Sequence, residues 1–283
     1  MDLPKIHSIT KKIFVALVGG FLLVFLLFHM TANLLILRHD GGEWYSAFCH
    51  FMGTNLLVKI AEIGLLGFIA LHILLTMWLA VTNRLARPVR YHQRSRTKTH
   101  IGSKLMIWTG VLIFACIAIH FYDFYLVKTG LVKGQYMVEQ KKMMESFLDE
   151  EIYWYGDNEY KHAEFSSLME RIDGETIGMD NVVHKISFED KEILERLLPG
   201  SDPEPDFYYQ AREKFSHLHI VIGYLVFFFI LFFHLSHAFP SAFQTLGLNN
   251  YKYNKAIEIL GKIYTWIIVL GFACVPILVY LGL

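Results

Sequence analysis

The sequence predicts an all-α integral membrane protein with five transmembrane helices. Hydrophobic residues make up 54% of the 283 residues, and the mean hydropathy is +0.37. Five apolar stretches each contain about 20 residues or more, the length of helix that crosses about 30 Å of hydrocarbon. The expected spans are 13–37, 57–83, 105–128, 217–239 and 257–283.

The first span follows a short basic segment that contains Lys5, Lys11 and Lys12. A removed signal peptide would end in a small-residue cleavage site, and none follows this stretch. We therefore expect the first span to be an anchor helix.

The charges between the spans predict an orientation. The connection 84–104 carries seven basic residues and no acid, and Lys252 and Lys255 follow the fourth span. Basic connections face the cytoplasm. With five spans, we expect a cytoplasmic N-terminus and a C-terminus outside.

The connection between the third and fourth spans is long and acidic. Of the chain's 26 acids, 19 lie in 131–206, beside 8 basic residues. We divide the chain into spans one to three (1–128), an extramembrane insertion on the outer side (129–212), and spans four and five (213–283). Helices are expected over 135–151 and from a capping box at Ser187. A solvated cap is the simpler interpretation of the insertion, and a docking surface is the alternative.

Four histidines lie deep inside four different spans: His29, His72, His120 and His234. A titratable side chain at this depth is costly and is a functional candidate. At about 1.5 Å per residue, His29 and His120 come near the outer face, and His72 and His234 near the inner face. The sequence therefore predicts an outer pair and an inner pair, separated by on the order of 15 Å.

Two such pairs suit two haems, each held between two imidazoles that fill both axial positions of the iron. A bundle of the first four helices offers facing interior side chains for this purpose. No Cys-x-x-Cys-His occurs among the three cysteines, so the expected cofactors are two non-covalent b haems. His237, one turn from His234, is a rival ligand. For a lone interior histidine, a hydrogen-bonded packing role is the simpler interpretation.

Two further residues are candidates for quinone binding or proton transfer. Glu62 lies near the outer end of the second span, three residues from Lys59, and a surface ion pair between them is the simpler interpretation. His50 lies just before that span, where interfacial packing is the simpler role.

Four stretches carry a resemblance to a known family. They are FLLFHMTANLL around His29, IALHILLTMWLAVTNRLARPVRY around His72, TGVLIFACIAIHFYDFY around His120, and FHLSHAFPSAFQTLGLNN around His234. Over about 5–128 and 215–283, the chain resembles the five-helix, two-haem cytochrome b subunit of succinate:quinone oxidoreductases, that is, succinate dehydrogenases and fumarate reductases. In this family a ligand histidine lies thirteen residues before the glycine of a Trp-Gly or Leu-Gly pair that ends the helix, which from Gly247 gives His234.

The resemblance implies a membrane anchor in a bacterial cytoplasmic membrane, with menaquinone or another quinone as substrate. Its partners would be a flavoprotein subunit that holds the succinate site, an iron–sulfur subunit on the cytoplasmic face, and membrane lipid, but no nucleic acid. The chain would belong to a respiratory enzyme without being catalytic toward succinate itself. A dimer of the complex is compatible with the resemblance.

The chain departs from the family in two places. The 129–212 insertion replaces a short connection. Some fumarate reductases carry a glutamate where this chain has Phe232, which favours succinate oxidation here. The alternative functions are a haem b subunit of another respiratory complex, of the hydrogenase or formate dehydrogenase type, and a cofactor-free membrane transporter.

Overall fold

The computed structural model describes residues 8–86, 101–139, 185–188 and 204–283. The chain divides into two compact units. Unit 1 comprises Met1–Ala118 and Lys214–Leu283, and unit 2 comprises Ile119–Glu213. Each unit is described by itself.

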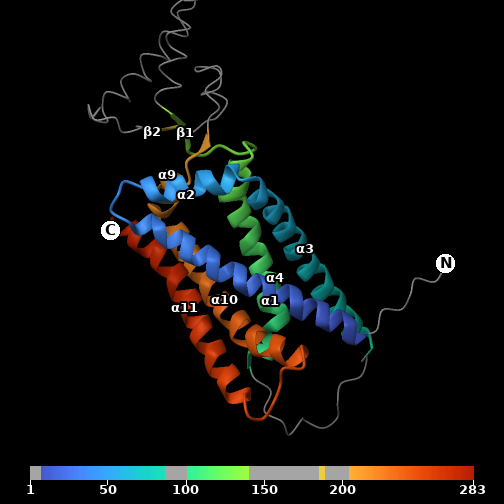
Figure 1. The fold of residues 1–283 in the computed structure, drawn as a ribbon. Helices are drawn as coiled ribbons and strands as arrows, with labels where there is room; N and C mark the ends of the chain where they lie inside the picture. Colours follow the sequence, from blue (N-terminus) through green and yellow to red (C-terminus); the bar gives the residue numbers. More distant parts are fainter. Residues whose placement is uncertain (1–7, 87–100, 140–184, 189–203) are drawn as a thin grey trace, which may run out of the picture. The chain divides into compact units, whose positions relative to one another are not determined.

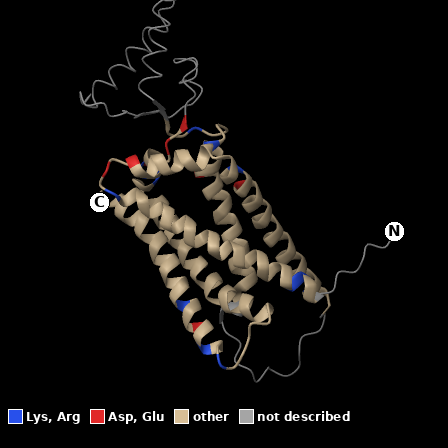
Figure 2. Ribbon diagram, in the orientation of Figure 1, with Lys and Arg blue, Asp and Glu red and all other residues tan. Residues whose placement is uncertain are grey.

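Five helical segments within the described residues are long and apolar enough to cross a membrane. Their bounds are Ile9–Leu37, Leu56–Leu85, Leu105–Lys128, Leu218–Thr245 and Asn254–Tyr280. This confirms the five predicted spans and the mostly helical class. The chain is therefore a multi-pass membrane protein. In Figure 2 the charged residues of unit 1 gather toward the helix ends and leave the central turns without charge.

The core of unit 1 is made by the first, fourth and fifth spans. These are helices α1 (Ser8–Asn33), α10 (Leu218–Thr245) and α11 (Asn254–Tyr280), and they pack on one another (Figure 1). Met30, Leu231, Leu235 and Ile268 form its buried cluster. The fifth helix thus contributes to this core, whereas the expected bundle contained only the first four spans.

The second and third spans begin with helices α3 (Leu56–Leu85) and α4 (Ile101–His120). Asn55 caps α3, because its side-chain oxygen accepts hydrogen bonds from Leu57 N and Val58 N at 2.9 and 3.3 Å. Helix α3 packs on α1. All of α3 lies within the described residues, and none of its residues is buried by the protein alone.

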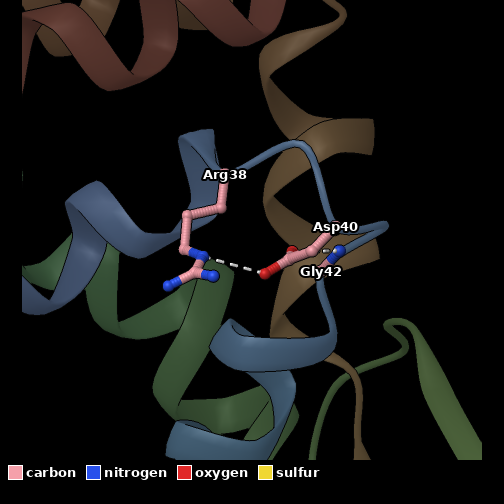
Figure 3. Close-up of polar contacts among 3 residues, drawn as sticks. All are labelled: Arg38, Asp40 and Gly42. Atoms are coloured by element: carbon pink, nitrogen blue, oxygen red, sulfur yellow. Dashed lines mark hydrogen bonds and ion pairs between the residues drawn. The ribbon is translucent and has the colours of Figure 1, made fainter.

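A short helix follows the first span where the sequence predicted only a loop. After the 3₁₀ turn η1 (Leu34–Leu37), Asp40 accepts from Arg38 Nε at 3.0 Å and from Gly42 N at 3.1 Å (Figure 3). Gly42 has φ 88°, a conformation that glycine adopts without a steric penalty. This turn reverses the chain into α2 (Glu43–Thr54). The helix has only 12 residues and so gave no span-length signal.

Helix α10 continues beyond the predicted end of the fourth span. The expected end at 239 preceded Pro240, but the helix runs through this proline to Thr245. Its end has the hydrogen bonds of a Schellman motif, from Leu248 N to Phe243 O and from Gly247 N to Gln244 O. Gly247 has φ 76° at the left-handed position, so the Leu-Gly pair of the sequence is the helix stop.

In unit 2 the ends of the insertion form a small antiparallel sheet. Strands β1 (Tyr136–Glu139), β2 (Lys185–Phe188) and β3 (Glu204–Pro205) lie in the order β2-β1-β3. The predicted helices over 135–151 and from Ser187 are therefore wrong at 136–139 and at 187–188. Ser187 pairs with Met137 across the sheet, a long-range contact that no local capping pattern reveals. The rest of both segments lies outside the described residues.

A buried polar cluster holds this sheet to the end of the third span in unit 2. Gln210 is 1% exposed, donates to Asp123 O at 2.9 Å and accepts from Gln135 N at 2.8 Å. The Tyr136 hydroxyl donates to Val127 O at 2.7 Å. Gln210 lies on the unpredicted helix α9 (Phe207–Phe215), which Asp206 caps.

Candidate functional site

Two of the four predicted histidines lie close enough inside unit 1 to interact electrostatically. His72 lies on α3 and His234 on α10, and their side chains are within electrostatic range of each other. His237, one turn further along α10, is also in range of His234. Both rings of the expected inner pair therefore belong to one local site.

Each of these two rings lies against a glycine of a neighbouring helix. A Cβ atom at Gly19 on α1 would be 3.6 Å from His72 Cε1, and one at Gly110 on α4 would be 3.7 Å from His234 Cε1. Small residues let helices and bulky groups approach closely within a membrane protein. Among the described glycines of the spans, these two lie beside the rings of His72 and His234.

The second ring has a polar contact of its own. Thr109 on α4 places Oγ1 3.2 Å from His234 Nδ1. The same hydroxyl lies 3.1 Å from the carbonyl oxygens of Leu105 and Met106. Thr109 was not predicted from the sequence, because the sequence of one helix does not show which residues of other helices it will contact.

The first ring has a nitrogen without a partner. Within the described residues, His72 Nδ1 is a buried side-chain atom with no hydrogen bond. An unpaired buried polar atom is costly and calls for an explanation, such as a bound group or a water molecule. Within the described residues, no protein group therefore supplies a hydrogen-bond partner for this buried ring nitrogen.

His29 lies among aromatic and amide groups of unit 1. Its ring stacks on Phe25 at 5.2 Å between centroids and approaches Phe272 at 5.7 Å. Asn33 Nδ2 donates to His29 O at 2.8 Å and lies 3.4 Å from His29 Nδ1. Asn33 Oδ1 in turn accepts from the Tyr45 hydroxyl of α2 at 3.3 Å.

His120 is the last residue of α4 and belongs to unit 2. Its ring lies 5.1 Å from that of Phe124. It is followed at once by a π-helical turn, η2 (Phe121–Tyr125), in which Asp123 is 8% exposed. Single π-helical turns are frequent at functional sites. Because His29 and His120 lie in different units, their pairing stays a prediction.

The two quinone or proton candidates lie on adjacent helices. His50 is exposed on α2, and Glu62 is half-buried in the second turn of α3. The two helices pack on each other. Both residues therefore lie toward the same end of unit 1. Their roles in quinone binding or proton transfer stay predictions.

Among the described residues, no three or more His, Cys, Asp and Glu side chains gather as they would around a bare metal ion. The site of His72 and His234 is instead two imidazoles that approach from two helices. No family model, curated protein or solved structure matches the chain. The site must therefore be interpreted from its own residues.

Proposed function

We propose that this chain is the membrane-anchoring cytochrome b subunit of a succinate:quinone oxidoreductase. It carries electrons between an iron–sulfur subunit and membrane quinone through two b haems with histidine ligands. The observation that supports the proposal is that His72 on α3 and His234 on α10, two imidazoles inside apolar spans, lie within electrostatic range of each other.

The groups around these histidines fit such a haem. An axial histidine binds iron through one ring nitrogen, and its other nitrogen usually has a hydrogen-bond partner. His234 has such a partner in Thr109, and the unpaired nitrogen of His72 marks an incomplete set of contacts. Gly19 and Gly110 let both rings lie close to helix backbones. When bound, a haem held by these histidines would supply one-electron transfer.

The register of the four histidines along their helices supports two levels. His29 and His120 each lie eight residues before the end of their span, and His72 and His234 each lie sixteen residues after the start of theirs. Successive spans run in opposite directions, so those ends and starts face the same side. At about 1.5 Å per residue, the first pair lies roughly 12 Å from that side and the second roughly 24 Å.

The basic connections orient these levels in a bacterial cytoplasmic membrane. Arg84 near the end of α3 begins the basic stretch, whose remainder lies largely outside the described residues, and Lys252 lies between α10 and α11. With these ends in the cytoplasm, His72 and His234 are on the side of the iron–sulfur and flavoprotein subunits. His29 and His120 then extend the electron path toward the outer face, where Glu62 and His50 are candidates for quinone protonation.

The test is a reduced-minus-oxidised visible spectrum of the purified protein, followed by identification of the subunits that purify with it. A b-type haem spectrum and a co-purifying flavoprotein with succinate dehydrogenase activity support the proposal. A protein without haem would instead be a transporter or structural anchor. Haem with hydrogenase or formate dehydrogenase partners would assign it to another respiratory complex.

A further inference from the structure

Thr109 is a buried threonine whose hydroxyl contacts three polar atoms. It is 7% exposed on α4. Its Oγ1 lies 3.1 Å from Leu105 O, 3.1 Å from Met106 O and 3.2 Å from His234 Nδ1. The first two contacts are ordinary for a threonine in a membrane helix, and the third connects α4 to α10.

The chemistry of the hydroxyl determines what it does to the histidine. A hydroxyl has one hydrogen to donate and two lone pairs that accept. A carbonyl oxygen only accepts, so the two backbone carbonyls attract the single hydrogen of Thr109. Its lone pairs then face His234 Nδ1, and this arrangement is satisfied when Nδ1 carries the ring hydrogen. In a neutral imidazole with hydrogen on Nδ1, Nε2 has a free lone pair.

The next residue of α4 completes the support. Gly110 faces Cε1 of the same ring, where a Cβ would lie 3.7 Å away. Two consecutive residues of α4 thus lie beside the same ring: the Thr109 hydroxyl at Nδ1, and Gly110, where an added Cβ would reach ordinary van der Waals contact with Cε1. The contact of the hydroxyl with Nδ1 restricts the rotation of the ring about its χ2 angle.

We propose that Thr109 is a positioning residue that holds His234 in the tautomer and orientation of an axial haem ligand. This inference rests on the proposed function. It also gives a physical reason for His234 to be a ligand. An acceptor on the outer ring nitrogen raises the basicity of the metal-bound one. A more basic ligand favours ferric iron, so Thr109 lowers the midpoint potential of the inner haem.

The test compares three variants by potentiometric titration of the haems in the assembled complex, with electron paramagnetic resonance of the ferric state. Thr109→Val keeps the shape of the side chain and removes the acceptor. Thr109→Ser keeps the acceptor. Thr265→Val is the matched control, because Thr265 is also buried (1% exposed) and donates to the carbonyl four residues before it, Gly261 O at 2.7 Å.

We expect Thr109→Val to raise the potential of the inner haem, identified as the component lost in His72→Ala, and to change its resonance. A tenfold shift in the ratio of ferric to ferrous haem corresponds to about 59 mV for one electron. Thr109→Ser and Thr265→Val should match the unaltered protein. Loss of the inner haem in Thr109→Val alone also supports the inference, because Thr109→Val keeps the side-chain shape and lacks the hydroxyl, whereas Thr109→Ser keeps the hydroxyl and lacks the methyl group.

An unchanged potential and resonance in Thr109→Val with full haem content would overturn the inference and leave the proposed function intact. Loss of haem in both Thr109 variants would also overturn it, because the hydroxyl that Thr109→Ser keeps would then not be what retains the haem. An unaltered protein without haem would overturn the proposed function, and the inference with it.

Discussion

His234 and His237 are separated by a single turn of α10, and His234 is the one that we propose as the ligand. Its Nδ1 has a hydroxyl partner on another helix, and its Cε1 faces a glycine. We predict that His234→Ala abolishes the inner haem, because the iron loses an axial ligand. His237→Ala should retain both haems, as measured by haem content and visible spectra. The reverse pattern would assign the ligand to His237.

At the scale of elements, α1 and α11 pack on each other, and Gly271 of α11 faces Met30 of α1. A Cβ at Gly271 would overlap the buried thioether of Met30, which belongs to the core cluster. We predict that Gly271→Val destabilises the protein by about 1–3 kcal/mol, as extra side-chain volume in a packed core does. Thermal unfolding in detergent measures this.

The compensating variant supplies the control for that prediction. Met30→Ala combined with Gly271→Val should recover part of the lost stability, since it removes the overlapping side chain. Additive losses in the double variant would mean that the two residues do not compete for the same space.

Among the helices and strands, some could be predicted from the sequence and others could not. The five spans were predictable, because length and apolar composition alone decide whether a helix crosses a membrane. The strands β1 and β2 were not, since residues 136–139 pair with residues 185–188 far along the chain. Pro240 was a misleading stop signal, because the helix continues through it to the glycine that ends α10.

The residues of the candidate site also include some that the sequence could predict and some that it could not. The histidines were visible in the sequence, because a titratable residue stands out in an apolar span. Thr109, Gly19 and Gly110 were not, because threonine and glycine are ordinary in such helices and only tertiary packing gives them a role. The same is true of Asn33, which lies beside His29, and of Tyr45, which donates to Asn33: only tertiary packing gives them a role.

For the whole molecule, the orientation of the spans makes a direct prediction. Two exposed positions lie in connections expected on opposite sides: Leu131 (75% exposed), after the third span, and Tyr251 (94% exposed), between α10 and α11. With the three native cysteines replaced, Leu131→Cys should react with an impermeant maleimide in cells with a permeable outer wall. Tyr251→Cys should react only after the inner membrane is opened. The opposite result would invert the topology and exchange which haem is near the soluble subunits.

In the proposed function electrons cross the membrane, so we expect the reaction to depend on the membrane potential. Moving one charge across the full membrane is worth about 2.3 kcal/mol per 100 mV. With quinone reacting near the outer haem, we predict that an uncoupler changes succinate:quinone activity in sealed vesicles. Glu62→Gln should slow this activity, because the half-buried carboxyl would no longer carry a proton. An activity insensitive to the uncoupler would place quinone near the inner haem, and an unchanged rate in Glu62→Gln would remove that residue from the path.

The central claim is that His72 and His234 hold one haem and that a second is held elsewhere in the chain. Haem per polypeptide, measured by the pyridine haemochrome method, tests it most directly. We predict about two haems in the unaltered protein, from its two histidine pairs, and about one in the His72→Ala, His234→Ala double variant. The His50→Ala variant is the control and should keep both. Two haems retained in the double variant, or none in the unaltered protein, would contradict the account.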